Sequence, residues 1–288
     1  MTQFTNYAEN KLIDMIRGQG LTLPSSWFVA LGSAASDSSF TELSGTGYAR
    51  EAVARSLANF AGTQGAGTTL ASTGSSHTSS NNVDLDWGTP GSNWGTASFL
   101  GFFDDLSAGN CWFWFPIDDI VITTGVPDPV VVPAGDLEFS LGVSGGMTDY
   151  LSNKLIDLLW RGQSYTWPSA VYVSRFTADP TNAGGGTEVA GGGYLRVTLL
   201  SATSTLSGTQ SPGSTSASSG TGGRTSNNAA LTWPAPTANQ GTTLSLGVHD
   251  APSAGNLLFW APVAEPRTVN NGGPAPSVAA DDLGITLD

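Results

Sequence analysis

Charged residues are scarce in this sequence. Only 11% of the 288 residues are Asp, Glu, Lys or Arg, against roughly 25% in an average soluble protein. Glycine, present 37 times, and abundant Ser and Thr take their place, a composition typical of turn-rich β proteins and of proteins on particle surfaces. The formal net charge of −13 repels phosphate backbones, so we expect no nucleic-acid partner.

Cysteine and histidine are also rare, with one Cys and two His. Cys111 lies in an apolar run at residues 111–115 and is expected to be a buried, inert thiol. A zinc site needs three or four Cys or His ligands, and a Ser-His-Asp arrangement needs an oriented histidine. His77 and His249 hold different positions in the repeat described below, and the turn at Asp250 recurs in the other copy without a histidine. We therefore predict no catalytic residue, no metal and no cofactor.

Long apolar runs are missing as well. No stretch approaches the roughly 18 apolar residues of a membrane-spanning helix, and residues 1–5 lack the pattern of a signal peptide. We expect a protein made in the cytoplasm with no membrane partner.

An internal repeat dominates what the sequence does contain. The motif NKLID at residues 10–14 returns at residues 153–157, and RGQ at residues 17–19 returns at residues 161–163. Further matches follow in the same order at offsets of 143 to 146: TE at 41 and 187, GTQ at 62 and 208, SNN at 80 and 226, and AGN at 108 and 254. Such a unit is a whole domain, and the polar stretch 144–146 resembles a linker. The chain is predicted to form two domains, 1–146 and 147–288.

Each unit is predicted to begin with a short helix. In the second unit Leu151, Leu155, Leu158 and Leu159 recur at helical spacing, with Thr148 or Asp149 as N-cap and Gly162 as the stop. Short β-type runs follow, at residues 27–31, 83–87 and 98–103 in the first unit and at 171–176, 194–200 and 257–260 in the second. The predicted fold class is mainly β, with two tandem antiparallel, jelly-roll-like β-sandwich domains, each led by a short helix.

Two low-complexity segments, residues 61–82 and 202–228, occupy the same place in both units. Loops of that length inside a domain are usually functional or disordered. We interpret them as projecting arms or long hairpins that lie on a neighbouring subunit, with disorder as the alternative.

Several side chains stand out as candidate contact or structural residues. Trp87, Trp94 and Trp233 lie among Gly, Pro and Asn, and an exposed position would suit an interface or a stacked glycan. A second set recurs in both units and is interpreted as structural, each arginine binding a carboxylate or loop carbonyls: Tyr48, Arg50, Asp104, Tyr194, Arg196 and Asp250. The acidic doublets at 104–105, 118–119 and 281–282 are interpreted as turn residues, since they fit no calcium-loop pattern.

The second copy is similar to a family of small tailed-phage virion proteins, usually labelled tail fibre or gp80-like. The similarity rests on residues 153–157, 187–196, 226–234 and 250–259 and, more weakly, on 41–50 and 103–105 of the first copy. Leu195 replaces the alanine usual in the family, and residues 117–133 look like an insertion.

The resemblance implies a non-enzymatic structural protein of the virion, with other virion proteins of the capsid, neck or tail as partners. Capsid decoration and a tail or collar fibre component both fit it. The duplication suits a homo-oligomer, for instance a trimer that presents six similar units. From other classes, a host-glycan adhesin is the alternative that the three tryptophans would favour, and a polysaccharide depolymerase is disfavoured because no carboxylate or histidine constellation recurs in both copies.

Overall fold

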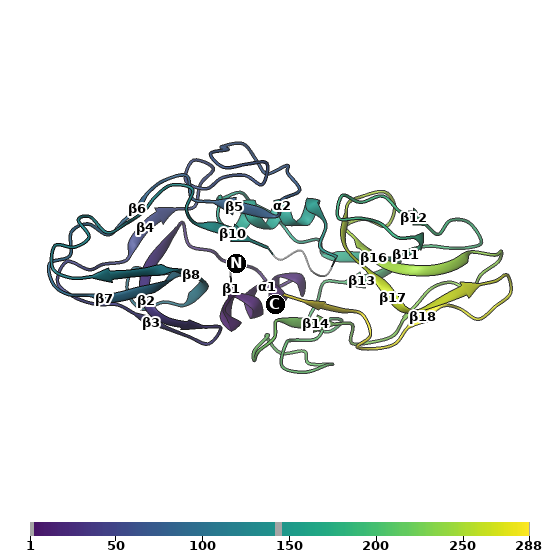
Figure 1. The fold of residues 1–288 in the computed structure, drawn as a ribbon. Coiled ribbons are helices and arrows are strands. Elements are labelled where there is room, and N and C mark those ends of the chain that lie inside the picture. Colours follow the sequence, from purple (N-terminus) through teal and green to yellow (C-terminus); the bar gives the residue numbers. More distant parts are fainter. Residues whose placement is uncertain (1–2, 142–145, 288) are drawn as a thin grey trace.

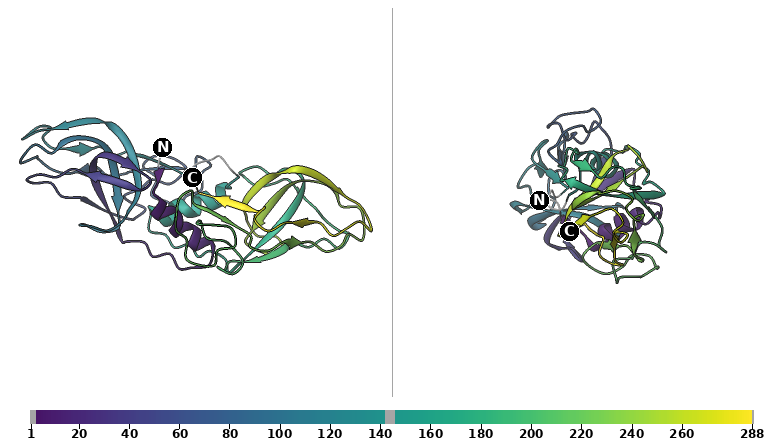
Figure 2. Two further views of the ribbon diagram at one scale, coloured as in Figure 1. Left: turned by 90° about the horizontal axis from the view of Figure 1, so that it is seen from below. Right: turned by 90° about the vertical axis from the view of Figure 1, so that its right-hand side faces the viewer.

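The computed structural model describes residues 3–141 and 146–287. The molecule is elongated, with a β-rich lobe from each repeat at either end and the two helices between them (Figures 1 and 2). The buried apolar side chains nevertheless form one continuous cluster that runs through both repeats. The expected linker at residues 144–146 lies outside the described residues except for Gly146.

The main sheet of the first repeat is antiparallel throughout, in the order β1-β8-β7-β2-β3, with β4 also paired to β2. Its strands are β1 (Gln3–Phe4), β2 (Ser26–Ser36), β3 (Ser39–Glu42), β4 (Glu51–Ala54), β7 (Gly95–Phe103) and β8 (Cys111–Ile122). Strand β7 lies between β2 and β8 and pairs with both. Side chains alternate between the two faces of each strand, and the apolar face of the sheet is buried along the middle of these long strands.

The second repeat builds the same sheet in the order β12-β11-β16-β17, with β13 paired to β11. Its strands are β11 (Ala170–Ala178), β12 (Thr187–Glu188), β13 (Val197–Leu200), β16 (Gly241–His249) and β17 (Leu257–Val269). The expected strands at 27–31, 98–103, 171–176 and 257–260 fall inside β2, β7, β11 and β17. The structure shortens the expected strand at 83–87 to β6 (Leu85–Asp86) and that at 194–200 to β13.

Two short antiparallel ladders in each repeat form a second layer. In the first repeat β5 (Thr78–Ser80) pairs with β10 (Glu138–Ser140), and β6 (Leu85–Asp86) pairs with β9 (Val131–Val132). In the second, β14 (Arg224–Ser226) pairs with β19 (Gly284–Thr286), and β15 (Leu231–Thr232) pairs with β18 (Ser277–Val278). Phe139 of β10 packs edge-on against Phe102 and Phe115 of the main sheet, which brings the two layers together. The predicted fold class, mainly β with two tandem domains each led by a helix, is confirmed.

The ladders correct one sequence interpretation. Residues 117–133 are not an insertion, because β8 and β9 have direct counterparts in β17 and β18 at the offset that the rest of the repeat keeps.

The two helices are α1 (Asn6–Ile16) and α2 (Asp149–Leu159). Thr5 and Thr148 are the N-caps, and their side-chain oxygens accept hydrogen bonds from the main-chain N–H groups of Ala8 and Leu151. Each helix ends shortly before a glycine with left-handed backbone, Gly18 or Gly162. No described helix is long and apolar enough to cross a membrane.

Candidate functional site

The helix of each repeat docks on the low-complexity loop of the other repeat. Arg161, which follows α2, is fully buried and donates hydrogen bonds to the carbonyl oxygens of Phe60 (2.9 Å) and Leu70 (2.5 Å) in the first repeat. Its guanidinium also pairs with Asp157 at 2.5 Å and bonds to the Ser72 hydroxyl at 3.0 Å. A buried arginine needs a carboxylate and several acceptors, and here most of the acceptors come from the partner repeat.

The reverse contact repeats this arrangement. Arg17, which follows α1, is also fully buried and donates to the carbonyl oxygens of Leu206 (3.0 Å) and Ser214 (3.2 Å) in the second repeat. It pairs with Asp14 at 2.7 Å and bonds to the Ser218 hydroxyl at 3.0 Å. The two halves of the interface are therefore related by the internal repeat: the Arg161 acceptors Phe60, Thr68 and Ser72 correspond to the Arg17 acceptors Leu206, Ser214 and Ser218.

The C-terminal end of α2 is capped by the first repeat. The carbonyl oxygens in the last turn of a helix have no partner within the helix. Arg55 donates to the carbonyls of Leu158 and Leu159, and the indole N–H of Trp27 donates to Leu159 at 3.0 Å. Burial lowers the pKa of Arg55 to about 10, so the side chain keeps its charge at neutral pH. A cation at this end also complements the helix dipole.

His77 adds a contact between the repeats that no sequence pattern predicted. The residue lies in the low-complexity segment 61–82, yet its side chain is 3% exposed and its Nε2 lies 2.9 Å from an Asp149 carboxylate oxygen at the start of α2. The equivalent position in the second repeat is Gly223, which approaches Glu9 of α1. The interface is therefore similar on its two sides but not identical.

The segments predicted to project onto a neighbouring subunit instead cover a helix of their own chain. Residues 61–82 lie over α2, where Asn153 donates to the Gly74 carbonyl, and residues 202–228 lie over α1, where Asn10 donates to the Gly220 carbonyl. The neighbour that they bind is the other repeat. Their Gly-rich and Ser-rich composition suits this position, because the loops follow the helix surface with main-chain groups rather than with bulky side chains.

The residues shared by both units form the same local network twice. In the first, the Tyr48 hydroxyl and the Arg50 guanidinium both bond to the Glu42 carboxylate, and Arg50 also donates to the carbonyls of Asp105 and Ala108 at 2.7 Å. Burial raises the pKa of Tyr48, so its hydroxyl stays protonated and donates to Glu42. This network joins β3, the following turn and the loop between β7 and β8.

The second unit repeats the network with Tyr194, Arg196 and Glu188. Arg196 donates to the carbonyls of Ala251 and Ala254 at 2.8 Å. Burial alone would raise the pKa of Glu188, but hydrogen bonds from Arg196 and Tyr194 outweigh it and lower the pKa.

Asp104 and Asp250 close the turn after β7 and β16. Each accepts hydrogen bonds from the main-chain and side-chain N–H groups of an asparagine six residues later, Asn110 or Asn256. Both carboxylates are thereby occupied within the fold.

The expected exposure of the three tryptophans is wrong. Trp87, Trp94 and Trp233 are 6%, 4% and 2% exposed. The indole N–H of Trp87 donates to the Val29 carbonyl and that of Trp94 to the Thr46 carbonyl. A satisfied N–H removes the cost of burying an indole, so polar neighbours in the sequence did not mean solvent.

Neither a Ser-His-Asp arrangement at His249 nor a metal-binding cluster forms in the described residues. The Nε2 of His249 lies 3.0 Å from the Ser174 hydroxyl, while Asp250 turns to Asn256 instead of orienting the imidazole. Burial and the nearby Arg196 charge lower the pKa of His249 to about 4, so at neutral pH it is uncharged. Within residues 3–141 and 146–287 no three His, Cys, Asp or Glu side chains gather as a metal site would require.

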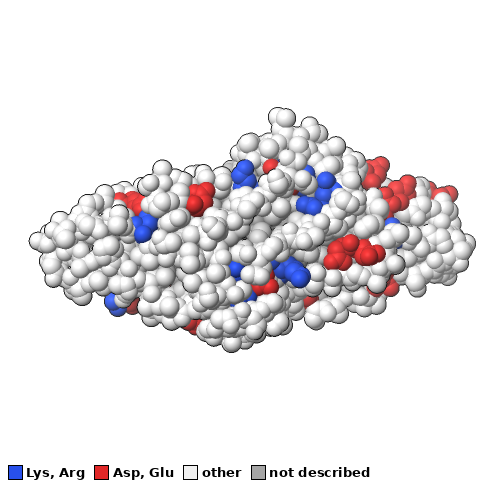
Figure 3. Space-filling view, turned by 180° about the vertical axis from the view of Figure 1, so that it is seen from behind, with Lys and Arg blue, Asp and Glu red and all other residues white. Residues whose placement is uncertain are grey.

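The surface carries little charge outside a few clusters. On the face drawn in Figure 3, acidic side chains gather most densely over the lobe of the first repeat, and much of the remaining surface is uncharged. The sequence shows the same bias, with 14 acidic residues in 1–146 and nine in 147–288.

Comparison with known proteins gives one result. A protein-family profile described as podophage GP4 fiber I protein gp80 matches residues 3–140 and, a second time, residues 146–286. One copy of the profile therefore corresponds to one repeat. A search of curated proteins finds no match.

Proposed function

Because the chain belongs to the family of podophage GP4 fiber I protein gp80, we propose that it is a fibre component of a tailed-phage virion. In this proposal it lies on the particle surface and acts by packing against other virion proteins of the tail or collar. The family description favours this position over capsid decoration.

The observation that carries the proposal is the reciprocal docking of α1 and α2. Two family units in one chain become a single elongated body, because each unit supplies the helix that the other must bury (Figure 1). The buried arginines and the continuous apolar cluster resist separation of the units. A fibre part must transmit force along its length without coming apart, and a body in which each half completes the other meets that need.

A non-enzymatic role is part of the proposal. The polar residues that recur in both units are the ones a shared active site would use, and each is engaged in holding loops together. We also propose that the boundary between the two units lies near residue 146. Whole chains assemble into a homo-oligomer such as a trimer, and neither nucleic acid nor membrane is a partner.

The glycan-binding alternative loses the feature that motivated it, because the three tryptophans are buried. A glycan array on the purified chain tests it independently of the virion role.

Quantitative mass spectrometry of purified particles tests the main proposal. A fibre component should be present at far fewer copies than the major capsid protein, and immunogold labelling should mark the tail or collar. A ratio near one to one would indicate capsid decoration instead. Absence from particles would overturn the virion role, and a monomer in light scattering of the purified chain would overturn the proposed homo-oligomer.

A further inference from the structure

The cores of the two repeats are filled differently. In the first repeat, the rings of Phe102, Phe115 and Phe139 pack edge-on with centroids 5.1 to 5.5 Å apart, and all three are buried. Trp160, which follows α2, adds a fourth ring 5.1 Å from Phe139. This aromatic cluster closes the space between the main sheet and the β5–β10 ladder.

The strand registers identify the counterparts in the second repeat. Phe102 corresponds to Val248, Phe115 to Ala261 and Phe139 to Ile285. Trp160 has no counterpart, because the first repeat has one residue fewer between the shared Asp and the shared Arg of the NKLID and RGQ motifs. Three aromatic rings are thus replaced by aliphatic side chains and a fourth is missing.

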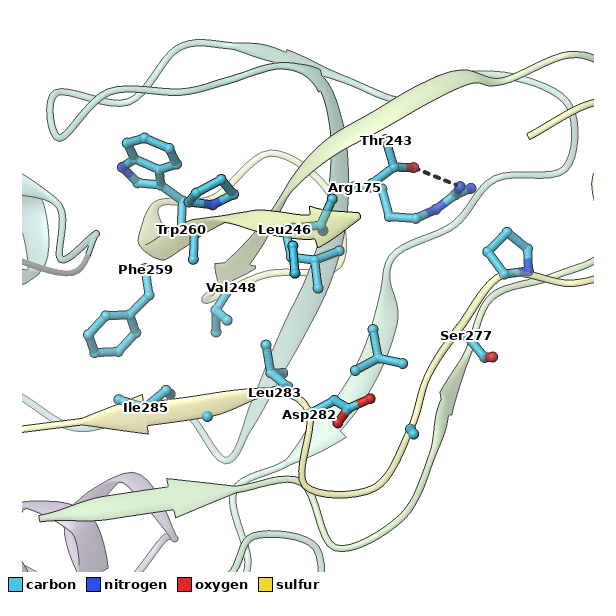
Figure 4. Close-up of a pocket in the computed structure, with 18 of the residues that line it drawn as sticks. Arg175, Thr243, Leu246, Val248, Phe259, Trp260, Ser277, Asp282, Leu283 and Ile285 are labelled. Atoms are coloured by element: carbon cyan, nitrogen blue, oxygen red, sulfur yellow. Dashed lines mark hydrogen bonds between the residues drawn. The ribbon is translucent and has the colours of Figure 1, made fainter. Parts of the chain in front are cut away.

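A cavity of about 1100 Å³ lies where these rings would be. Figure 4 shows Leu246 and Val248 of β16 on one side of it and Leu283 and Ile285 on the other. Pockets for small ligands usually measure about 300 to 1,000 Å³. The lining also includes the charged residues Glu265, Arg267 and Asp282, but its apolar part is unfavourable to leave in contact with water.

One end of the cavity is polar only in this repeat. Arg175 takes the place of Leu31, Thr243 of Ala97 and Gln240 of Trp94, by the same registers. Arg175 is 2% exposed and donates to Thr243 at 3.3 Å and to Gln240. The dashed contact in Figure 4 is the one to Thr243.

Arg175 forms no ion pair with the described acidic residues, and its Nε has no hydrogen-bond partner there. The Cζ atom of its guanidinium lies 5.3 Å from the ring centre of Tyr194 and 5.5 Å from that of Trp233. Trp233 also lines the cavity, and its buried indole N–H lacks an acceptor among the described residues, whereas its counterpart Trp87 donates to a carbonyl. Buried donors without an acceptor are unfavourable, so a ligand that brings an acceptor to Arg175 and Trp233 would be stabilised. The positive charge of Arg175 favours an anionic acceptor.

We propose that the cavity of the second repeat binds a single-chain amphiphile with an anionic head, of the fatty-acid class. The hydrocarbon chain lies along Val248, Leu246 and Ile285, and the carboxylate accepts hydrogen bonds from Arg175 and Trp233. Among the described residues Arg175 and the aliphatic replacements occur together in the second repeat, so we expect one molecule per chain.

Calorimetric titration of the purified, delipidated full chain with decanoate tests the proposal. One molecule of decanoate should bind per chain. Val248→Phe, which restores the ring of the first repeat, should weaken binding by more than about tenfold because it occupies the space of the chain. Val121→Phe is the matched control, since it adds the same ring at a position 62% exposed on β8, and it should leave binding unchanged. Thermal unfolding of each variant checks that it is folded.

Arg175→Leu, which restores the other residue of the first repeat, tests the head group. It should weaken decanoate by about tenfold or more and leave decanol unchanged, because only the charge-assisted contact is lost. Absence of saturable decanoate binding, equal binding by folded Val248→Phe, or an unchanged preference for decanoate over decanol in Arg175→Leu would each overturn the proposal. If the unmodified chain bound no amphiphile and the Val248→Phe chain failed to assemble into particles, the cavity would be assigned to a segment of another virion protein instead. Binding of decanoate does not depend on the fibre role, so failure of one leaves the other standing.

Discussion

Asp157 in the helix of the second repeat accepts hydrogen bonds from both the main-chain N–H and the hydroxyl of Ser72 in the first repeat, at 2.9 and 2.6 Å. The equivalent helix residue Asp14 accepts from the main-chain N–H of Ser218, the equivalent loop residue, at 3.0 and 3.1 Å. Each helix thus binds the loop of the other repeat through the same carboxylate and the same main-chain N–H group. The two repeats thus exchange helix–loop contacts within one chain, while the N-cap of each helix stays bonded to the long strand of its own repeat, β8 or β17.

A double-mutant cycle checks the exchange. Asp157→Asn and Ser72→Ala should each destabilise the chain, and their combined effect on the free energy of unfolding should depart from additivity by about 0.5 to 3 kcal/mol, as expected for residues in one network. The free energies come from urea unfolding.

Ser218→Ala provides the matched control, because Ser218 is the residue that Asp157 would contact if each helix stayed on its own repeat. Asp157→Asn and Ser218→Ala should be additive. Coupling between Asp157 and Ser218, with none between Asp157 and Ser72, would mean that the helices are not exchanged.

The exchange could not be read from the sequence, although much of the fold could. The offset of 143 to 146, the helix motif and the alternating strands were sufficient for the two helices and the main strands. The motif NKLID is identical in both repeats and the loops are alike, so these segments alone do not decide which loop each helix binds. The choice between them depends on how the chain connects the units in space, and local sequence carries no signal for that.

The candidate site shows the same division. The pairing of Arg50 and Arg196 with a carboxylate and loop carbonyls follows from their recurrence and from the chemistry of arginine. The burial of Trp87 and Trp94 could not be predicted in this way, because each indole N–H donates to a carbonyl that another strand or turn supplies. The substitution of Leu31 by Arg175 is visible only once the strand registers align the two cores.

Glycine at the end of the first helix is required by close approach as well as by its backbone. A Cβ on Gly18 would lie 2.1 Å from the Ser201 carbonyl oxygen of the second repeat. Gly18→Ala should therefore lower the free energy of unfolding by at least about 1 kcal/mol more than the left-handed backbone alone explains.

Gly213→Ala isolates the backbone contribution. Gly213 has almost the same φ, +75° against +74°, and no atom within 4 Å of the added Cβ. Equal losses of stability in the two variants would show that the contact between the repeats is loose at Gly18.

The aromatic cluster of the first repeat should contribute heavily to stability. Phe115 is 2% exposed and contacts Phe102 and Phe139. Phe115→Ala should cost about 3 to 5 kcal/mol in urea unfolding, because it opens in the first repeat the space that the second already has. Val121→Ala on the same strand, at 62% exposure, should change stability by less than about 0.5 kcal/mol. A cost for Phe115→Ala as small as that control would show that the first core is not closed by these rings.

His249 should make stability depend on pH in a range where few other groups titrate. Burial, aided by the Arg196 charge, lowers its pKa in the folded chain to about 4, whereas an unfolded histidine titrates near about 6.5. Between these values the unfolded chain binds a proton that the folded chain does not, so stability is full above about pH 6.5 and falls as the pH is lowered toward about 4. His249→Phe restores the first-repeat residue, Phe103, and should remove this slope while leaving the acid unfolding caused by carboxylates below it. Urea unfolding of both proteins at a series of pH values measures the difference. Parallel curves between pH 6.5 and 4 would mean that the imidazole is protonated equally in the folded and unfolded chains.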